Sequence, residues 1–230
     1  MFDSTNVDNR KQDFLRTALD LFYEKGYEST KITDICKEMD VTKGAFYYYF
    51  ESKEDILVAI AEAFTEKSVD IIRSIINQPG TSVLEKINKM FISINRLKFK
   101  ERDWRTKFKR AVKSEENLKL QNRIASSLKL SSISMLKELI DAGAREGEFG
   151  DIVNSDEMAE FLINTILSLN IAVDDLENEL YKTENDNQEC ISKIEQKVHF
   201  YGVMLDRAFQ VREGSFDLRT PYMIKISGEG

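Results

Sequence analysis

Apolar residues recur every three or four positions along most of the chain, which is the spacing of one buried face of an α-helix. The first such pattern covers about residues 10–25 and is followed by Gly26, a residue suited to a left-handed helix end. Further patterns predict short helices near 31–39 and 43–49 and a longer one over about 53–77. We therefore predict that the chain begins with a compact head built from three small helices.

Beyond Gly80 the helical spacing continues in longer stretches. It predicts helices over about 82–100, 104–112, 115–145, from Ser155 or Asp156 onward, and from about 190 to Phe209. An acidic loop is expected over 174–189, and residues 214–230 lack a helical period, so they are expected to be disordered or to pack as an arm.

The predicted fold class is therefore all-α, with about nine helices in total and a helix-turn-helix in the N-terminal head. We expect a head over 1–55, a larger helical bundle over 56–213, and an irregular tail over 214–230. The composition agrees, because 2 prolines and 10 glycines in 230 residues favour helices over turn-rich β architecture.

Several classes of protein are disfavoured by the sequence. No apolar run approaches the ~20 residues that a membrane-spanning helix needs, and the N-terminus lacks the features of a signal peptide, so we expect a cytoplasmic protein. Cys36 and Cys190 lie far apart without metal-ligand spacing, so we expect reduced thiols, no metal and no cofactor. His199 is the single histidine and has no nucleophile or carboxylate spaced around it, so we expect no enzymatic activity.

The most informative segment lies at residues 33–53. Thr42 is suited to cap a helix, and the small residues Gly44 and Ala45 in the first turn would let the helix start approach base edges closely. Tyr47, Tyr48 and Tyr49 follow in succession. Successive helical residues point about 100° apart, so the three tyrosines cannot all be buried. We expect at least one or two of them to face outward, as in a recognition helix whose hydroxyl groups reach phosphates.

The charge balance points to modest non-specific affinity for DNA. The net charge is −7, and the first 55 residues hold 8 Lys and Arg against 12 Asp and Glu, which gives −4. Non-specific affinity rises with the number of phosphates neutralised, so a few well-placed lysines would have to carry the electrostatic contribution.

The head resembles the DNA-binding domain of the TetR family of bacterial transcriptional repressors. The family's Phe-x-x-x-Gly-Tyr/Phe pattern is matched by Phe22 to Tyr27, and its Asp-Ile-Ala segment by Asp34-Ile35-Cys36. Its Val-Ser/Thr-Lys-Gly run is matched by Val41 to Phe50 and by Lys53, with Tyr49 where His is common. The similarity covers about residues 10–57. It supports a predicted set of DNA-binding residues. In this set the residues at the helix starts approach the bases, while the tyrosines and lysines contact phosphates. The set is Thr30, Lys31, Thr33, Thr42, Lys43, Gly44, Ala45, Tyr47, Tyr48, Tyr49 and Lys53.

The resemblance implies that the head over 1–55 binds DNA and that the body over 56–213 carries ligand binding and dimerisation. It also implies a homodimer that binds a palindromic or pseudo-palindromic operator in double-stranded DNA and is released by a small-molecule effector. Broad apolar faces on the last two long helices, with a mid-helix glycine that close helix approach would explain, predict the dimer interface. Its predicted residues are Leu162, Ile166, Leu169, Val198, Tyr201, Gly202, Leu205 and Phe209.

An effector pocket is predicted where large apolar residues accompany a basic run. Residues 96–113 hold nine Lys and Arg against two acids, which gives +7. A solvated helix face is the ordinary explanation of such a run, and the alternatives are an apolar effector with a negative group or added DNA contact. The predicted lining is Phe91, Phe99, Trp104, Phe108, Met135 and Leu139. The alternative to a ligand-released repressor is an effector-free helical adaptor that binds DNA or a protein partner.

Overall fold

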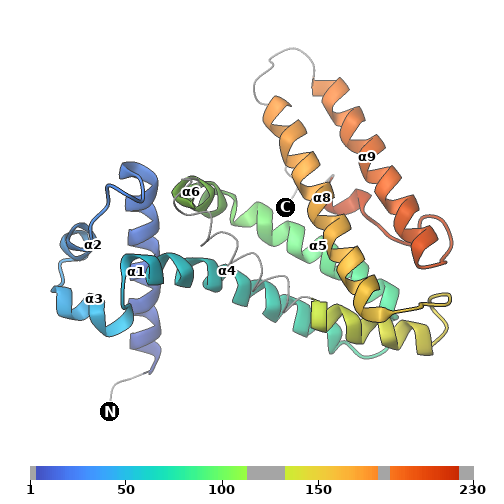
Figure 1. Ribbon diagram of the computed structural model, residues 1–230, viewed down its shortest axis with the longest axis horizontal. Coiled ribbons are helices and arrows are strands. Elements are labelled where there is room, and N and C mark those ends of the chain that lie inside the picture. Colours follow the sequence, from blue (N-terminus) through green and yellow to red (C-terminus); the bar gives the residue numbers. More distant parts are fainter. Residues whose placement is uncertain (1–3, 113–132, 181–186, 223–230) are drawn as a thin grey trace. The chain divides into compact units, whose positions relative to one another are not determined.

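The computed structural model describes residues 4–112, 133–180 and 187–222, and in these segments every regular element is a helix (Figure 1). The described residues form two compact units. The first, the head, contains α1 (Ser4–Lys25), α2 (Ile32–Glu38), α3 (Lys43–Tyr49), the part of α4 (Lys53–Ile76) up to Ser68, and α6 (Arg102–Val112). The second, the body, contains the rest of α4, α5 (Val83–Lys100), a helix over 133–145, α8 (Ser155–Leu180), α9 (Asn187–Ala208) and the segment that follows. The all-α prediction is confirmed.

The head is built around the apolar stripe that the sequence predicts for its first helix. Phe14, Phe22, Ile35 and Phe46 are fully buried in one cluster. Gly26 has φ +85° and ends α1, and Tyr27 folds back so that its ring lies 5.0 Å from that of Phe22. Local sequence signals thus set both the helix ends and the buried face of this unit.

The head is larger than the predicted residues 1–55, because α6 packs along α1. Lys107 of α6 forms ion pairs with Asp20 of α1 at 2.7 Å and with Asp103 at 3.0 Å. These two carboxylates raise the pKa of the Lys107 ammonium, so it stays charged. Trp104 is stacked between Phe64 and Phe108, with ring centroids 5.1 and 5.2 Å apart. Residues distant in sequence therefore complete the unit, and this is why periodicity alone placed the boundary too early.

The body is built around a helical hairpin, with α8 and α9 side by side (Figure 1). Its core includes Leu162, Leu169, Ile194 and Leu205, all fully buried. Among the described residues no helix is both long enough and apolar enough to span a membrane.

A partly buried side chain, that of Glu148, ties the start of α5 to the turn before α8. Both carboxylate oxygens of Glu148 accept backbone N–H groups, from Val83 at 2.8 Å and from Leu84 at 2.9 Å. These N–H groups belong to the first turn of α5 and have no partner inside that helix. The carboxylate also lies where a helix N-terminus favours negative charge. Glu148 therefore caps α5 from a distance of 64 residues in the sequence.

Replacing Glu148 with Gln should lower the free energy of unfolding by about 2–3 kcal/mol, because an amide can accept only one of the two N–H groups and carries no charge. Urea unfolding of the variant beside Glu146→Gln, an exposed neighbour in the same turn, measures the effect. Equal midpoints for the two variants would show that the cap does not stabilise the body.

One prediction about the C-terminal part of the chain needs correction, and one of the two alternatives expected for the tail is observed. The acidic loop expected over 174–189 is helical at both ends, since α8 continues to Leu180 and α9 begins at Asn187. The segment 214–222 of the predicted irregular tail is packed as an arm: Phe216, Leu218 and Tyr222 are at most 3% exposed. Residues 223–230 of that tail lie outside the described residues.

The packed arm is held by side chains from three helices. Asn88 of α5 donates to the carbonyl of Ser215 at 2.7 Å and accepts the N–H of Asp217 at 3.0 Å. The hydroxyl of Tyr222 donates to Asn170 of α8 at 2.9 Å. Asp206 of α9, itself 3% exposed, accepts the N–H groups of two arm residues. Hydrogen bonds between distant residues therefore order a segment that has no helical period of its own.

Candidate nucleic-acid interface

The second and third helices form a helix-turn-helix whose turn is defined by backbone hydrogen bonds. The N–H of Val41 donates to the carbonyl of Cys36 at 2.9 Å, and Asp40 adopts a left-handed φ of +52° in the turn. Thr42 caps α3, with its hydroxyl accepting the N–H of Ala45 at 3.3 Å. Fully buried Phe46 anchors α3 to the head core. The observed bounds of α3, Lys43–Tyr49, confirm the predicted helix.

The start of α3 and two of its tyrosines are open to solvent. Lys43 and Gly44 are exposed, and Tyr47 and Tyr48 are 54% and 72% exposed. The capped first turn presents short side chains, which allows close approach to base edges, and the two phenols follow directly. The prediction that at least one or two tyrosines face outward is confirmed.

The third tyrosine has a different role from its two neighbours. Tyr49 is half-buried, and its ring lies 5.5 Å from that of Phe14 and packs against the head core. On α2, Lys31 and Thr33 are exposed. The backbone N–H of Lys31 donates to the carboxylate of Asp34 at 2.9 Å, which closes the helix start and leaves the lysine side chain outside the helix.

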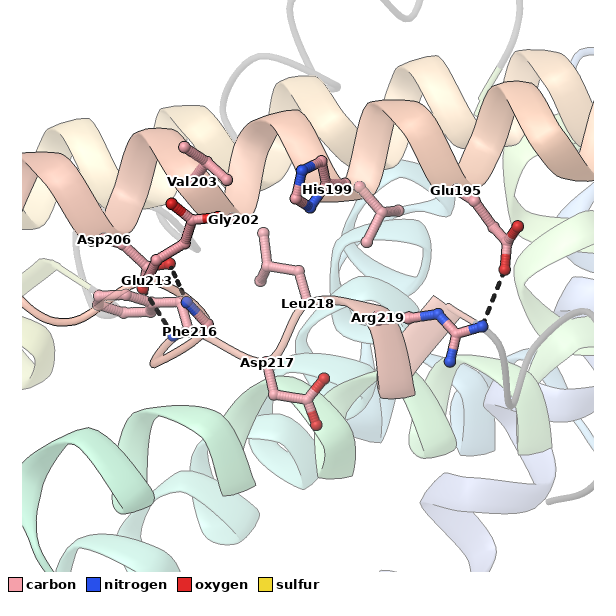
Figure 2. A pocket seen from close by; sticks show the side chains of 12 residues that line it. Glu195, His199, Gly202, Val203, Asp206, Glu213, Phe216, Asp217, Leu218 and Arg219 are labelled. Atoms are coloured by element: carbon pink, nitrogen blue, oxygen red, sulfur yellow. Dashed lines mark hydrogen bonds and ion pairs between the residues drawn. The ribbon is translucent and has the colours of Figure 1, made fainter.

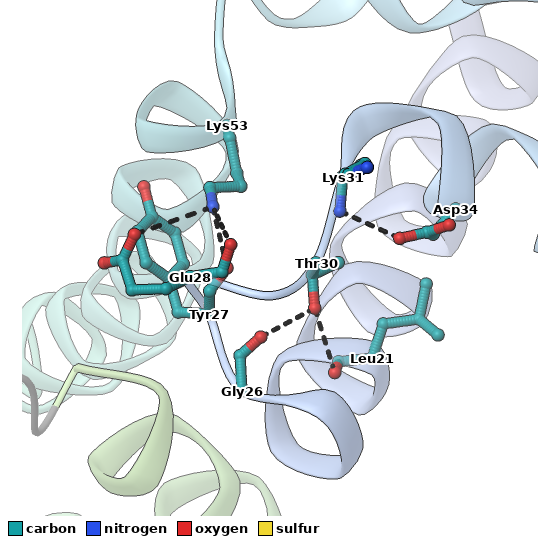
Figure 3. A network of polar contacts seen from close by, with 8 residues as sticks. All are labelled: Leu21, Gly26, Tyr27, Glu28, Thr30, Lys31, Asp34 and Lys53. Carbon is teal, nitrogen blue, oxygen red and sulfur yellow. Dashed lines mark hydrogen bonds and ion pairs between the residues drawn. The ribbon is translucent and has the colours of Figure 1, made fainter.

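The structure corrects the role predicted for Thr30 (Figure 3). Thr30 is 1% exposed, and its hydroxyl lies 2.8 Å from the carbonyl oxygen of Gly26 and 3.2 Å from that of Leu21. A buried hydroxyl engaged by backbone carbonyls is unavailable to a phosphate. Thr30 therefore joins the end of α1 to the start of α2.

Thr30→Val should destabilise the head by about 1–2 kcal/mol, because the isosteric side chain removes the buried hydroxyl that donates to the carbonyl oxygens at the end of α1, chiefly that of Gly26. Thr30→Ser retains the hydroxyl and should lie closer to the wild type. Thermal unfolding of the two variants tests this difference. A Thr30→Val variant with normal stability but weakened DNA binding would restore the phosphate-contact role.

Lys53, predicted to hold a phosphate, is tethered within the head (Figure 3). Its ammonium donates to the carbonyl of Tyr27 at 2.7 Å and to that of Glu28 at 3.3 Å, and it lies 4.2 Å from the centroid of the Tyr27 ring. Burial, with smaller contributions from Glu28 and Glu54, raises the pKa of the Tyr27 phenol to about 12, so the phenol stays neutral. Lys53 thus fixes the start of α4 against the turn after α1, a role that the sequence pattern did not reveal.

The six predicted pocket residues do not share one core. Phe91, Met135 and Leu139 pack in the body core, and Phe99 is half-buried in the same unit. Trp104 and Phe108 pack against the head core instead. An effector site lined by these residues remains a prediction.

Most residues predicted for the dimer interface are part of the body's own core. Leu162, Leu169, Val198, Leu205 and Phe209 are at most 2% exposed, so they are already covered within the chain. Tyr201 and Ile166 are half-buried, and Tyr201 shares a hydrogen bond with Ser168 at 3.2 Å. A Cβ built on Gly202 would meet the carbonyl oxygen of Phe216 in the arm at 3.6 Å, an ordinary contact, so no close helix approach requires this glycine.

A different set of apolar residues on the same two helices is exposed. It comprises Phe161 (42%), Leu167 (48%) and Ile171 (65%) on α8 and Phe200 (58%) on α9. Helical spacing places the three α8 residues on the solvent side of that helix, together with exposed Asn164 and Ser168. The sequence alone does not single out these residues, because the most regular apolar stripe on the two helices predicts a different interface. The sequence does indicate a second apolar face, because α8 carries large apolar residues outside that stripe.

Known proteins resemble both the helix-turn-helix and the complete fold. Residues 14–60 match the sequence model of the bacterial regulatory proteins, tetR family. The HTH-type transcriptional regulator YuxN of Bacillus subtilis is 36% identical over 83 residues, which cover 35% of this chain and 28% of that protein. The solved structure of a TetR-family transcriptional regulator from Pectobacterium atrosepticum has a TM-score of 0.59 at 15% identity and covers 90% of this chain and 97% of its own.

These similarities identify a helix-turn-helix protein whose head, over residues 14–60, matches the tetR family of bacterial regulatory proteins. A second relative, the HTH-type transcriptional regulator YdgC of Bacillus subtilis, is 24% identical over 166 residues, or 71% of this chain and 80% of its own. The match to YuxN spans less than a third of that relative's length, so the similarity to the family rests on the head.

Proposed function

We propose that this protein is a transcriptional regulator that binds operator DNA through α3 of two subunits. The observation that supports this role best is the exposed start of α3, where Lys43 and Gly44 are followed by the exposed phenols of Tyr47 and Tyr48. A short helix that projects from a rigid three-helix head, with small residues at its start, suits insertion into a major groove. The function is regulatory and cytoplasmic, with no catalytic role.

The proposed regulator is a homodimer whose interface is the exposed face of α8 with Phe200 of α9. Three large apolar residues exposed on one side of a single helix are unfavourable in water, and a two-fold partner would cover them with its own copy of the same face. Two heads related by this symmetry read a palindromic or pseudo-palindromic operator.

We further propose that the protein is a repressor, released when a small molecule binds to the body. Helix α4 supports such a coupling because it is continuous from Lys53 to Ile76 and contributes to both cores. Ile56, Leu57 and Ile60 belong to the head core, whereas Ile72 and Ile75 belong to the body core. A ligand that prefers one packing of the body can shift α4 and thereby change DNA affinity, provided that it binds the two states differently.

Selection of DNA from a random pool by the full-length protein tests the proposed function directly. The expected product is a single enriched motif with two-fold symmetry. Its affinity should fall steeply with salt, as phosphate contacts require. Enrichment of no motif, with salt-dependent binding to all fragments alike, would instead indicate a non-specific DNA-binding protein.

A further inference from the structure

The body carries a groove between α9 and the arm that follows it, with a volume of about 630 Å³ (Figure 2). This volume lies within the roughly 300–1,000 Å³ that is usual for small-molecule sites. The side chain of His199, on α9, lies on one side of the groove, and that of Leu218, on the arm, lies on the other. The groove is separate from the predicted pocket, with which it shares no residue.

The walls of the groove are fixed by internal hydrogen bonds. The carboxylate of Asp206 accepts the N–H of Gly214 at 2.7 Å and that of Phe216 at 2.9 Å, and so fastens the arm to α9. Asn88 holds the same arm from α5 through Ser215 and Asp217. A ligand that enters this groove meets walls that are already ordered, which reduces the entropy cost of binding.

Gly202 lines the groove near Asp206 and Glu213 and adds no side-chain atoms to it. Its φ is not left-handed, and a Cβ placed there would have only an ordinary contact with the carbonyl oxygen of Phe216. Alanine is more favourable than glycine inside a helix, so neither backbone conformation nor packing accounts for this residue. An open groove does account for it.

The charges around the groove are predominantly negative. The groove is lined by four carboxylates and one guanidinium. The guanidinium, that of Arg219, pairs with Glu195 at 2.9 Å, and the other carboxylates are those of Asp206, Glu213 and Asp217. Asp206 is engaged by the arm backbone, and Asp217 accepts the N–H of Thr220 at 2.9 Å. Within the described part of the chain, the carboxylate of Glu213 forms no hydrogen bond or ion pair.

We propose that this groove binds a small organic cation with an apolar body. The ammonium group of the ligand contacts Glu213, and its apolar part lies over Gly202 between Leu218 and Val203. Carboxylates at the rim of an apolar groove favour a positive ligand and disfavour a negative one. The proposal concerns binding alone, and it holds whether or not the ligand changes the affinity for DNA.

Calorimetric titration of the full-length protein with three matched probes tests the charge preference. Phenethylammonium should bind at least about tenfold more tightly than neutral 2-phenylethanol, and anionic 3-phenylpropanoate should bind most weakly. The preference should shrink as salt is raised. Equal affinities for the three probes, or no saturable binding of phenethylammonium, would overturn the proposal.

Two variants locate the site. Glu213→Gln should weaken phenethylammonium binding at least about threefold, whereas Glu146→Gln, an exposed carboxylate outside the groove, should leave it unchanged. Gly202→Ala should raise the thermal midpoint by about 2 °C while it weakens binding, a combination that misfolding cannot produce. Wild-type affinity in both variants would place binding elsewhere. An affinity that falls as protein concentration rises would show that a second copy of the chain, and not a small cation, occupies the groove.

Discussion

Ile171→Asp should convert the proposed dimer into a monomer at micromolar concentration. Ile171 is 65% exposed on α8, so the substitution costs the isolated subunit little. In a dimer covered by the same face of a partner, two carboxylates would be buried near the two-fold axis without compensation. We expect a loss of about 2–4 kcal/mol in dimerisation free energy, or roughly 30- to 1,000-fold in the dissociation constant.

Sedimentation equilibrium measures this change, and Val153→Asp provides a matched control. Val153 is also a β-branched apolar residue and is fully exposed, but it precedes α8 and lies outside the proposed interface. The control should remain dimeric. Phe200→Asp should weaken the dimer as Ile171→Asp does, since the proposed interface includes both helices. A dimer unaffected by either substitution would mean that the exposed apolar face serves another partner.

Replacing both Lys43 and Tyr47 with Ala should nearly abolish specific DNA binding while the head remains folded. Both side chains are exposed on α3, so their removal leaves the buried anchor Phe46 in place. Each contact to a base edge or phosphate is worth roughly 1–3 kcal/mol, so the double variant should lose about 2–6 kcal/mol if the two contributions add. The loss applies to each half-site of a palindrome.

Fluorescence anisotropy with the selected operator measures this loss over a range of salt concentrations. Lys43→Ala alone should reduce the salt slope by about one phosphate contact. Lys25→Ala removes an equally exposed charge at the end of α1 and should have a smaller effect. Tyr47→Phe separates the contribution of the hydroxyl from that of the ring. Unchanged operator affinity in the double variant would exclude α3 as the reading helix.

The elements that were predicted correctly depend on neighbouring residues. The bounds of α3, its cap at Thr42 and the left-handed Gly26 follow from interactions within a few residues of the chain. The outward direction of Tyr47 and Tyr48 follows from the geometry of a short helix with a buried Phe46. These features define most of the candidate DNA-binding surface, and a single sequence is enough to find them.

Thr30 and Lys53 show where local reasoning fails. Both are polar residues next to a recognition motif, and the sequence does not distinguish a side chain that reaches DNA from one that bonds to the protein's own backbone. The carbonyl oxygens that engage them, at Leu21 and Gly26 for Thr30 and at Tyr27 and Glu28 for Lys53, are brought close only by the packing of the head.

By itself the sequence determined an all-helical chain, the position of its helix-turn-helix and that α3 exposes at least one or two of its three tyrosines, because periodicity and capping act over single helical turns. Only the tertiary structure decided which apolar face of α8 is buried within the chain and which is open to a partner. It also decided that α6 belongs to the head and that the arm packs against α9 to form a groove. Each of these features depends on contacts between residues far apart in sequence, and an amphipathic pattern does not specify which partner covers a given face.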